Sequence, residues 1–340
     1  MIVTYFRSSS YNQYDMCPHS YYLTYVLGHR SPSGQKAEQG TIVHKVMECL
    51  ANAKQCHQNE EHSFNDDLFG EMEVDFDYIY TDEYVKELIE KSYEHYSSES
   101  IHHWTNKHHK ECDKWSWDAI QYFDGAFDPR KRNIVSPECA FDFEIDEDWA
   151  KYDYILPSGK KLSGNLSMKG TIDLITEVRP NVYEVVDWKT GRRLDWATGQ
   201  EKDYKKLTTD PQLRIYHYAL SKIYPDAEQF LMTIFFIRDG GPFTLCFTKE
   251  DMEDTKKMIK KRFEEIKRVA IPRLKKTWKC TRICHFGKNA HESGEVDPNT
   301  GEPYTICEYV ARTIKKRGMN TSLIEDISPG HHFDYYEAPG

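Results

Sequence analysis

Apolar residues recur at helical spacing in the N-terminal part of the chain. The segment TIVHKVMECLA, residues 41–51, places four of them three or four positions apart, so that they share one helix face. These four are Val43, Val46, Met47 and Leu50. We therefore expect residues 1–55 to form an N-terminal helical segment. Residues 56–133, which are acidic and rich in His, Trp and Tyr, are predicted to be a helical insertion.

Four later segments are rich in β-branched and aromatic residues, a composition typical of strands. They are ECAFDFEI (138–145), MKGTIDLITEV (168–178), VYEVVDW (182–188) and QFLMTIFFI (229–237). A helical pattern over residues 210–223 separates the third strand from the fourth. This order predicts an α/β core with a mixed sheet over residues 134–248. Residues 249–340 are then expected to supply a basic helix and a cysteine-bearing C-terminal segment that closes on the N-terminus.

Charge is segregated along the chain. The 45 Lys and Arg residues against 55 Asp and Glu give a formal net charge of −10, which taken alone argues against a nucleic-acid partner. Residues 60–99, however, carry fourteen acidic and two basic side chains, whereas residues 256–288 carry thirteen basic and two acidic ones. A basic segment can bind phosphates while the whole chain stays acidic. We therefore expect any DNA contact at residues 256–288 and not in the acidic segment.

Composition narrows the class of protein. Hydrophobic residues make up 39% of the 340 residues, which is enough for a packed core and excludes wholesale disorder. No apolar run is long enough for a membrane span, and no secretory signal pattern is visible. The nine cysteines, an odd number scattered along the chain, favour a reducing cytoplasm over a disulfide framework. The tail after Gly330 is expected to be poorly ordered.

The most informative segment runs from Gly170 to Gly191. Asp173 lies in the apolar sequence GTIDLI, where a carboxylate is costly to bury unless it is paired or bound to a metal. Alternation along VVDWKTG puts Asp187 and Lys189 on one strand face, and a turn at residues 179–181 would bring Asp173 opposite Asp187. Two carboxylates and an ammonium at one sheet edge suit Mg²⁺ or Mn²⁺. The competing interpretation is a surface Asp–Lys pair with an unrelated Asp173.

Four motifs, taken in order, resemble the RecB-type branch of the PD-(D/E)XK nuclease superfamily. GTIVHKVME resembles a helix whose histidine joins the metal site, and GTIDL resembles the segment with the first metal-binding aspartate. DWKTG resembles the acid-x-Lys signature, and DPQLRIYHYAL resembles the following Gln-x-x-x-Tyr helix. The resemblance covers residues of about 40 to 240. It implies a restriction-endonuclease-like core, in which helices flank a mixed central sheet.

The same resemblance implies roles for individual residues. The implied metal ligands and catalytic residues are His44, Glu138, Asp173, Asp187, Lys189, Gln212 and Tyr216. Of these, His44, Asp173 and Asp187 would bind the metal, whereas Glu138 is expected to shape the site rather than bind the ion. Gln212 and Tyr216 are four positions apart, so they share a helix face and can point together into the site. The competing interpretation of His44 is a histidine buried in the core. For Gln212 and Tyr216 it is that they are ordinary positions of an amphipathic helix, with no role in a site.

The implied activity is that of a divalent-metal-dependent DNA exonuclease. Water activated by Mg²⁺ or Mn²⁺ would attack a backbone phosphorus and leave a 5′-phosphate and a 3′-hydroxyl. The expected substrates are DNA ends or single strands, in end processing, repair, recombination or viral DNA metabolism. No Walker-type motif occurs, so unwinding would require a helicase or recombination partner. The alternatives are an end-trimming nuclease of the CRISPR-adaptation type and a non-catalytic DNA-end-binding subunit of a larger complex.

Four cysteines resemble the cluster ligands of iron–sulfur members of this family, which combine one N-terminal cysteine with three C-terminal ones. They are Cys17, Cys280, Cys284 and Cys307. The resemblance implies a [4Fe–4S] cluster, although Cys307 lies farther along the chain than the family pattern has it. His285 and His291 lie in the intervening loop, so a structural Zn²⁺ site is a second possibility, and unrelated free thiols are a third. In either metal site, binding would stabilise the fold.

Overall fold

The computed structural model describes residues 1–155, 159–195 and 199–317, so the expectation for the tail after Gly330 lies outside the described residues. The chain folds into two compact units, each assembled from separate stretches. Unit 1 comprises residues 1–32, 142–169 and the chain from 254 onward, and unit 2 comprises residues 33–141 and 170–253. The sequence analysis predicted four consecutive segments, with boundaries at residues 55, 133 and 248. That division follows the order of the chain, and it stays a prediction.

A mixed sheet forms the centre of unit 2. Its strands are β4 (Ile134–Glu144), β7 (Ser167–Arg179), β8 (Val182–Lys189), β9 (Gln229–Phe236) and β10 (Gly241–Phe247). Their order is β7-β8-β9-β10, with β4 beside β7. The pairs β7–β8 and β9–β10 are antiparallel, whereas β8 and β9 run parallel. The predicted α/β fold with a mixed central sheet is therefore confirmed, although the prediction missed β10.

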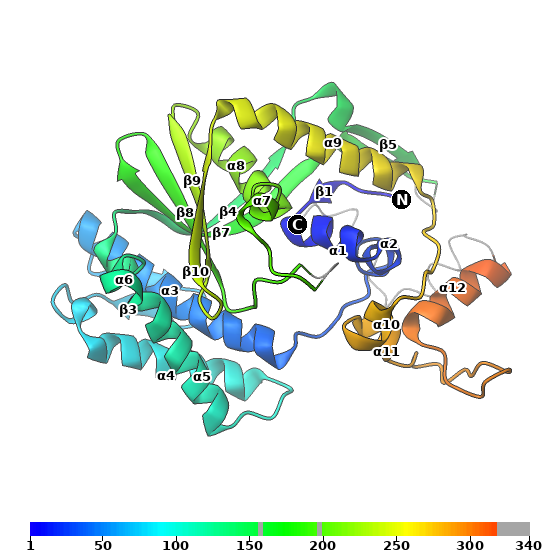
Figure 1. Ribbon diagram of the computed structural model, residues 1–340, viewed down its shortest axis with the longest axis horizontal. Coiled ribbons are helices and arrows are strands. Elements are labelled where there is room, and N and C mark those ends of the chain that lie inside the picture. Colours follow the sequence, from blue (N-terminus) through cyan, green and yellow to red (C-terminus); the bar gives the residue numbers. More distant parts are fainter. Residues whose placement is uncertain (156–158, 196–198, 318–340) are drawn as a thin grey trace. The chain divides into compact units, whose positions relative to one another are not determined.

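Helix α3 (Gln35–Asn59) covers one face of this sheet, as Figure 1 shows. The predicted apolar stripe of α3 is fully buried. It packs in one cluster with Leu174 of β7 and with Val186 and Trp188 of β8. Burying one large aliphatic side chain stabilises a fold by about 1.5–3 kcal/mol, so this stripe accounts for the firm attachment of α3 to the sheet.

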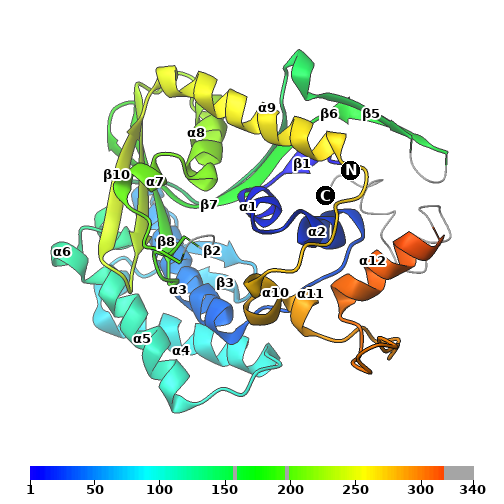
Figure 2. The same cartoon turned by 45° about the vertical axis from the view of Figure 1, so that its right-hand side comes forward.

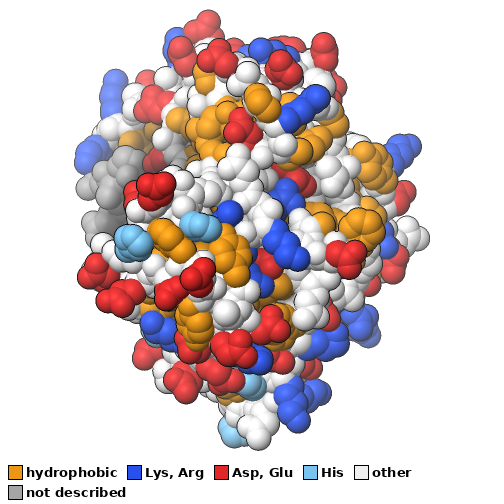
Figure 3. Space-filling view, turned by 90° about the vertical axis from the view of Figure 1, so that its left-hand side faces the viewer, with side chains coloured by type: hydrophobic (Ala, Val, Ile, Leu, Met, Phe, Trp, Pro, Cys, Tyr) orange, Lys and Arg blue, Asp and Glu red, His pale blue; other side chains and the backbone are white. Residues whose placement is uncertain are grey.

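The acidic segment packs on the outer side of α3. Helices α4 (Asp82–Glu99) and α5 (Asn106–Ile120) lie there in both ribbon views (Figures 1 and 2). The remaining elements are the hairpin β2 (Ser63–Asp66) and β3 (Gly70–Glu73), the short α6 (Tyr122–Gly125) and 3₁₀ turns at Tyr78–Tyr80 and Pro129–Lys131. Helices and a β-hairpin therefore occur together in residues 56–133, and the hairpin was not predicted. Figure 3 shows many acidic side chains on the lower part of one face, at the height of α4 and α5 in Figure 1.

Helix α8 (Pro211–Ile223) lies on the other face of the sheet, and α7 (Tyr204–Leu207) precedes it. Asp210 begins α8, since its side chain accepts a 2.9 Å hydrogen bond from the Gln212 N–H, and Pro211 occupies the first helical position. The ring of Tyr216 meets that of Phe141 of β4 edge to face. The helix predicted for residues 210–223 is confirmed, and it lies over the strands that carry the candidate carboxylates.

Unit 1 contains the N-terminus, a two-stranded hairpin and the whole basic segment, residues 256–288. Its elements are β1 (Tyr5–Phe6), α1 (Ser8–Met16), α2 (Pro18–Tyr21), a π-helical turn (Tyr22–Val26), a 3₁₀ turn (Asp148–Ala150), β5 (Lys151–Ile155), β6 (Lys161–Asn165), most of α9 (Met252–Arg268), α10 (Trp278–Arg282), α11 (His285–Lys288) and α12 (Ile306–Arg317). A 3₁₀ turn at Lys249–Asp251 precedes α9. Strand β1 pairs in parallel with Ser167 and Met168 at the start of β7.

Helix α9 packs through an apolar stripe of Ile259, Phe263 and Ile266, all fully buried. Arg262 on the same helix forms an ion pair with Asp15 of α1. Its guanidinium carbon lies 4.3 Å from the ring centre of Tyr11 of α1. The N-terminal helices and the basic helix are thus held together within unit 1. None of the helices among the described residues has both the length and the apolar character needed to cross a membrane.

One buried histidine makes the stability of the fold depend on pH. His217 of α8 is 1% exposed and lies against the rings of Phe230 and Phe247. Burial lowers its pKa from 6.5 to about 4. The neutral ring therefore stabilises the fold fully above pH 6.5, and this contribution is lost as the pH falls towards 4, by on the order of 3 kcal/mol.

We predict that His217→Phe, which keeps an aromatic ring, loses less free energy of unfolding than the wild type between pH 6.5 and pH 4. Urea unfolding at each pH measures this difference. The control is His103→Gln at an exposed position, which should follow the wild-type pH profile. Identical profiles for His217→Phe and the wild type would contradict the assignment.

Candidate metal and catalytic site

The candidate site lies where strands β7 and β8 separate. Their last paired residues at this end are Leu174 and Val186, and the next residues are Asp173 and Asp187. Beyond this point the side chain of Asp173 replaces a strand contact, because its Oδ2 atom accepts a 3.0 Å hydrogen bond from the Trp188 N–H. The hairpin register therefore brings the two aspartates to one place, the geometry expected from the turn at residues 179–181.

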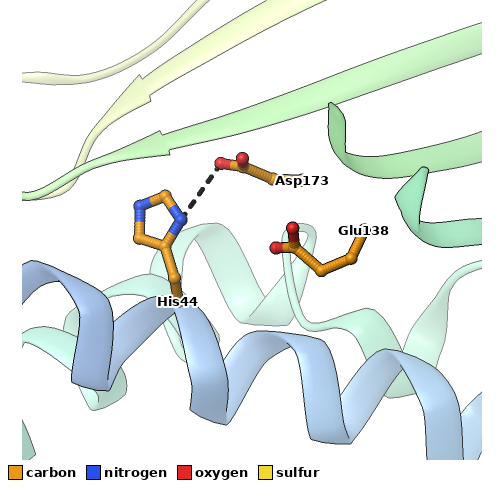
Figure 4. Close-up of side chains that lie close together, drawn as sticks. All are labelled: His44, Glu138 and Asp173. Atoms are coloured by element: carbon orange, nitrogen blue, oxygen red, sulfur yellow. Dashed lines mark ion pairs between the residues drawn. The ribbon is translucent and has the colours of Figure 1, made fainter. Parts of the chain in front are cut away.

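Three side chains from different elements converge at this point. His44 comes from α3, Glu138 from β4 and Asp173 from β7, and Figure 4 shows them directed towards one another. The distance between His44 Nδ1 and Asp173 Oδ2 is 3.3 Å. One ligand atom from each of the three lies within 4.8 Å of the other two. An imidazole nitrogen with two carboxylate oxygens is a donor set that fits Mn²⁺ or Mg²⁺.

Glu138 joins this group through an unusual backbone conformation. Its φ angle is +40°, which places a non-glycine residue in the left-handed region in the middle of a strand. Such strain costs on the order of 1–3 kcal/mol, and functional sites are where it is commonly found. Burial, followed by the nearby charges of Asp173 and Glu48, raises the pKa of Glu138 to about 8. The sequence placed Glu138 near the site, but only the structure brings it into the group with His44 and Asp173.

Asp187, the third metal ligand implied by the resemblance, is directed towards Lys189 and Gln212 and lies outside that group of three, so its role as a ligand stays a prediction. Its carboxylate is fully buried, and Lys189 Nζ lies 2.6 Å from its Oδ2 atom. Burial raises the pKa of Asp187 to about 6, although Lys189 opposes the shift. Burial by itself lowers the pKa of Lys189, but the charges of Asp187 and Asp173 outweigh it and leave this pKa above its usual value. Lys189 therefore stays a cation at neutral pH.

Gln212 and Tyr216 hold Asp187 from α8. The Gln212 amide nitrogen lies 2.9 Å from Asp187 Oδ1 and 2.8 Å from the Tyr216 hydroxyl oxygen. The Tyr216 hydroxyl donates a 2.8 Å hydrogen bond to the Thr171 carbonyl on β7. These contacts connect α8 to both β7 and β8. The spacing of four residues predicted that the two side chains point the same way, and they do.

A cavity of about 430 Å³ opens beside these residues. Its lining contains His44, Glu138, Asp173 and Lys189, and also Lys45, Glu48 and Asp67, which the sequence analysis did not select. The sequence could have indicated Lys45 and Glu48, because they lie on α3 one and four residues after His44. Gly40 allows α3 to approach the loop after β8, since a Cβ atom there would lie 2.6 Å from Thr190 Oγ1.

The four candidate cluster cysteines all lie in unit 1. A hydrogen bond from Cys307, followed by backbone N–H groups of Gly287 and Phe286, lowers the pKa of Cys284 to about 6. The pKa of Cys307 is raised, first by its hydrogen bond to Cys284 and then by burial, with smaller contributions from Cys17 and Cys280. The backbone N–H groups of Ser20 and Thr277 each lie 3.4 Å from a sulfur, those of Cys17 and Cys280 respectively. The fold thus brings distant cysteines together.

The two histidines of the zinc alternative have other contacts. His285 Nδ1 lies 2.9 Å from the side-chain nitrogen of Asn289. His291 Nδ1 accepts a 3.1 Å hydrogen bond from the Ser293 N–H, and its ring stacks on Tyr309 at 3.7 Å. These contacts of the two histidines are thus with Asn289, Ser293 and Tyr309 and not with the four cysteines.

No curated protein matches the chain. Among solved structures, the chain is similar to a crystal structure of a provisionally named exonuclease from Eubacterium rectale, with 12% identity and a TM-score of 0.41 over 78% of this chain and 80% of that one. The family model described as the PD-(D/E)XK nuclease superfamily matches residues 8–288, which include every candidate residue of the metal site. This protein therefore belongs to the PD-(D/E)XK nuclease superfamily.

Proposed function

We propose that this protein is a divalent-metal-dependent deoxyribonuclease of the RecB type that acts as an exonuclease on DNA ends or single strands. The observation that carries the proposal is the convergence of His44, Glu138 and Asp173 at the fork of β7 and β8, beside the Asp187–Lys189 pair. Nucleases of this superfamily use divalent metals, and the donor set fits such an ion. A role in DNA end processing, repair, recombination or viral DNA metabolism is part of the proposal.

The residues of the fork have separate roles in this proposal. His44, Glu138 and Asp173 hold Mg²⁺ or Mn²⁺, and an ion bound there supplies an activated water and offsets charge on the phosphoryl oxygens. Lys189, which stays protonated, neutralises the phosphate that approaches the fork. Gln212 and Tyr216 keep the Asp187 carboxylate directed at Lys189. The imidazole ligand favours Mn²⁺ over Mg²⁺.

We predict that Lys189→Met and Asp173→Asn each lower the rate of DNA cleavage by about 10²- to 10³-fold, because each removes a charge that acts on the reacting phosphate. The measurement is degradation of end-labelled single-stranded and double-stranded DNA with Mg²⁺ or Mn²⁺. The matched control is Lys222→Met on the exposed side of α8, which should cleave at the wild-type rate.

Several outcomes of this assay, run in parallel with labelled RNA, would contradict the proposal or favour one of its alternatives. Wild-type cleavage by both variants would place the chemistry elsewhere, and DNA-end binding without cleavage by the wild type would favour the non-catalytic subunit. Stronger cleavage of RNA than of DNA would contradict the substrate class. Trimming restricted to short duplexes with overhangs would favour the CRISPR-adaptation type of nuclease.

The DNA contact is proposed to include the exposed side of α9. Lys257, Lys260 and Lys261 are exposed there, whereas Lys256 is ion-paired with Glu147 at 2.6 Å. We predict that Lys260→Gln together with Lys261→Gln weakens DNA binding and reduces the slope of log affinity against log salt by about 1.4–1.8, since each lost phosphate contact removes about 0.7–0.9. Fluorescence anisotropy over a salt series measures this slope. An unchanged slope, equal to that of Lys222→Gln, would place the DNA path elsewhere.

We further propose that Cys17, Cys280, Cys284 and Cys307 bind a [4Fe–4S] cluster, as in the iron–sulfur members of the family, in a protein of the reducing cytoplasm. The contributions of Cys284, Cys17 and Cys280 to the raised pKa of Cys307, and the backbone N–H groups beside the sulfurs of Cys17 and Cys280, support this assignment. The cluster would join residues from both ends of the chain, so its role would be structural.

We predict that anaerobically purified protein absorbs near about 400 nm and contains iron, and that Cys280→Ala loses both. The control is Cys246→Ser at an exposed position of β10, which should keep them. Zinc without iron in the wild type would establish the zinc alternative. Neither metal in the anaerobic preparation would show that the thiols are free.

A further inference from the structure

A second set of carboxylates, Glu48, Asp66 and Asp67, surrounds a lysine, and Glu48 and Asp67 of this set line the same cavity as the candidate metal group. Lys45 Nζ lies 2.6 Å from Asp67 Oδ1, 2.7 Å from a Glu48 oxygen and 3.2 Å from Asp66 Oδ2. Ligand atoms of the three acids lie within 4.8 Å of one another, as do those of His44, Glu138 and Asp173. The cavity is therefore lined by one complete group of three donors and by two members of a second group, which already encloses a positive charge.

The enclosed ammonium is held rigidly. The side chain of Lys45 is 5% exposed, and that of Asp66 is fully buried. Asp66 Oδ1 accepts hydrogen bonds of 2.9 and 3.0 Å from the N–H groups of Leu68 and Phe69, which leaves Oδ2 directed at Lys45. A buried ammonium is stable only when it is paired, and removal of the cation would leave buried carboxylates without a counter-charge. The three acids and Lys45 are thus one electrostatic unit.

We propose that Lys45 takes the place of a second divalent cation in this cavity, so that the protein binds one ion, at His44, Glu138 and Asp173, and not two. Two-metal nuclease sites hold their ions about 3.5–4 Å apart and need carboxylates for both. Here all three carboxylates of the second set already pair with one ammonium, which comes from the same helix that carries His44. Lys45 is therefore a positioning residue, which keeps Glu48 and Asp66 from competing for the ion. This inference rests on the proposed metal site.

The test is a count of bound Mn²⁺ on the full-length, chelator-treated protein, by isothermal titration calorimetry and by electron paramagnetic resonance of free Mn²⁺. We expect one Mn²⁺ per chain for the wild type and a second one for Lys45→Met, because the three acids then lack their cation. Adding Asp67→Asn to Lys45→Met should return the count to one. Lys54→Met on the same helix is the matched control and should bind one Mn²⁺.

A second variant keeps the test decisive if Lys45→Met does not fold. Asp67 is 76% exposed, so Asp67→Asn in the otherwise wild-type chain should fold normally. We expect it to bind one Mn²⁺ with an affinity within about twofold of the wild type.

Three results would overturn the inference. They are two Mn²⁺ ions per wild-type chain with one of them lost in Asp67→Asn, a marked loss of affinity in Asp67→Asn, or a folded Lys45→Met protein that still binds one ion. Failure of the proposed metal site itself looks different, because Asp173→Asn would then bind as much Mn²⁺ as the wild type.

Discussion

The separation of strands β7 and β8 is the constraint on which the candidate site depends. Where the backbone pairing stops, the carboxylate of Asp173 accepts a hydrogen bond from the backbone N–H of Trp188. A backbone donor at such a point must find a partner, because a buried unpaired N–H group is costly. The side chain that satisfies it is therefore held in one orientation. The separation of the two strands leaves room for side chains from α3 and β4. The candidate metal site therefore forms without a separate loop.

Charge balance is the second physical requirement of this region. The cavity and the fork bring together the carboxylates of Glu48, Asp67, Glu138, Asp173 and Asp187, of which that of Asp187 is fully buried. Carboxylates this close raise one another's pKa unless cations offset their charge. Lys189 offsets the charge of Asp187, and Lys45 that of Glu48 and Asp67. The group of His44, Glu138 and Asp173 has no such lysine within ion-pair distance among the described residues, which is why it suits an external cation.

Much of the fold was predictable because its strands and helices have strong local patterns. The hairpin of β7 and β8, the helix α8 and the stripe of α3 all follow from periodicity and turn residues. Strand β10 was missed although two glycines with positive φ mark its start, Gly240 in the turn before it and Gly241 as its first residue. The hairpin β2–β3 was missed because its strands are short and largely polar, so that only its packing reveals it.

The sequence by itself determined the strand carrying Asp173, the pair Asp187 and Lys189, and the shared face of Gln212 and Tyr216. All of these depend on spacing within one element or one hairpin, where the period of the backbone sets direction. Only the tertiary structure decided that Glu138 joins His44 and Asp173 and that Lys45 is enclosed by acids. These contacts join α3, β4 and the β2–β3 hairpin, and contacts between separate elements depend on packing, which no local pattern records.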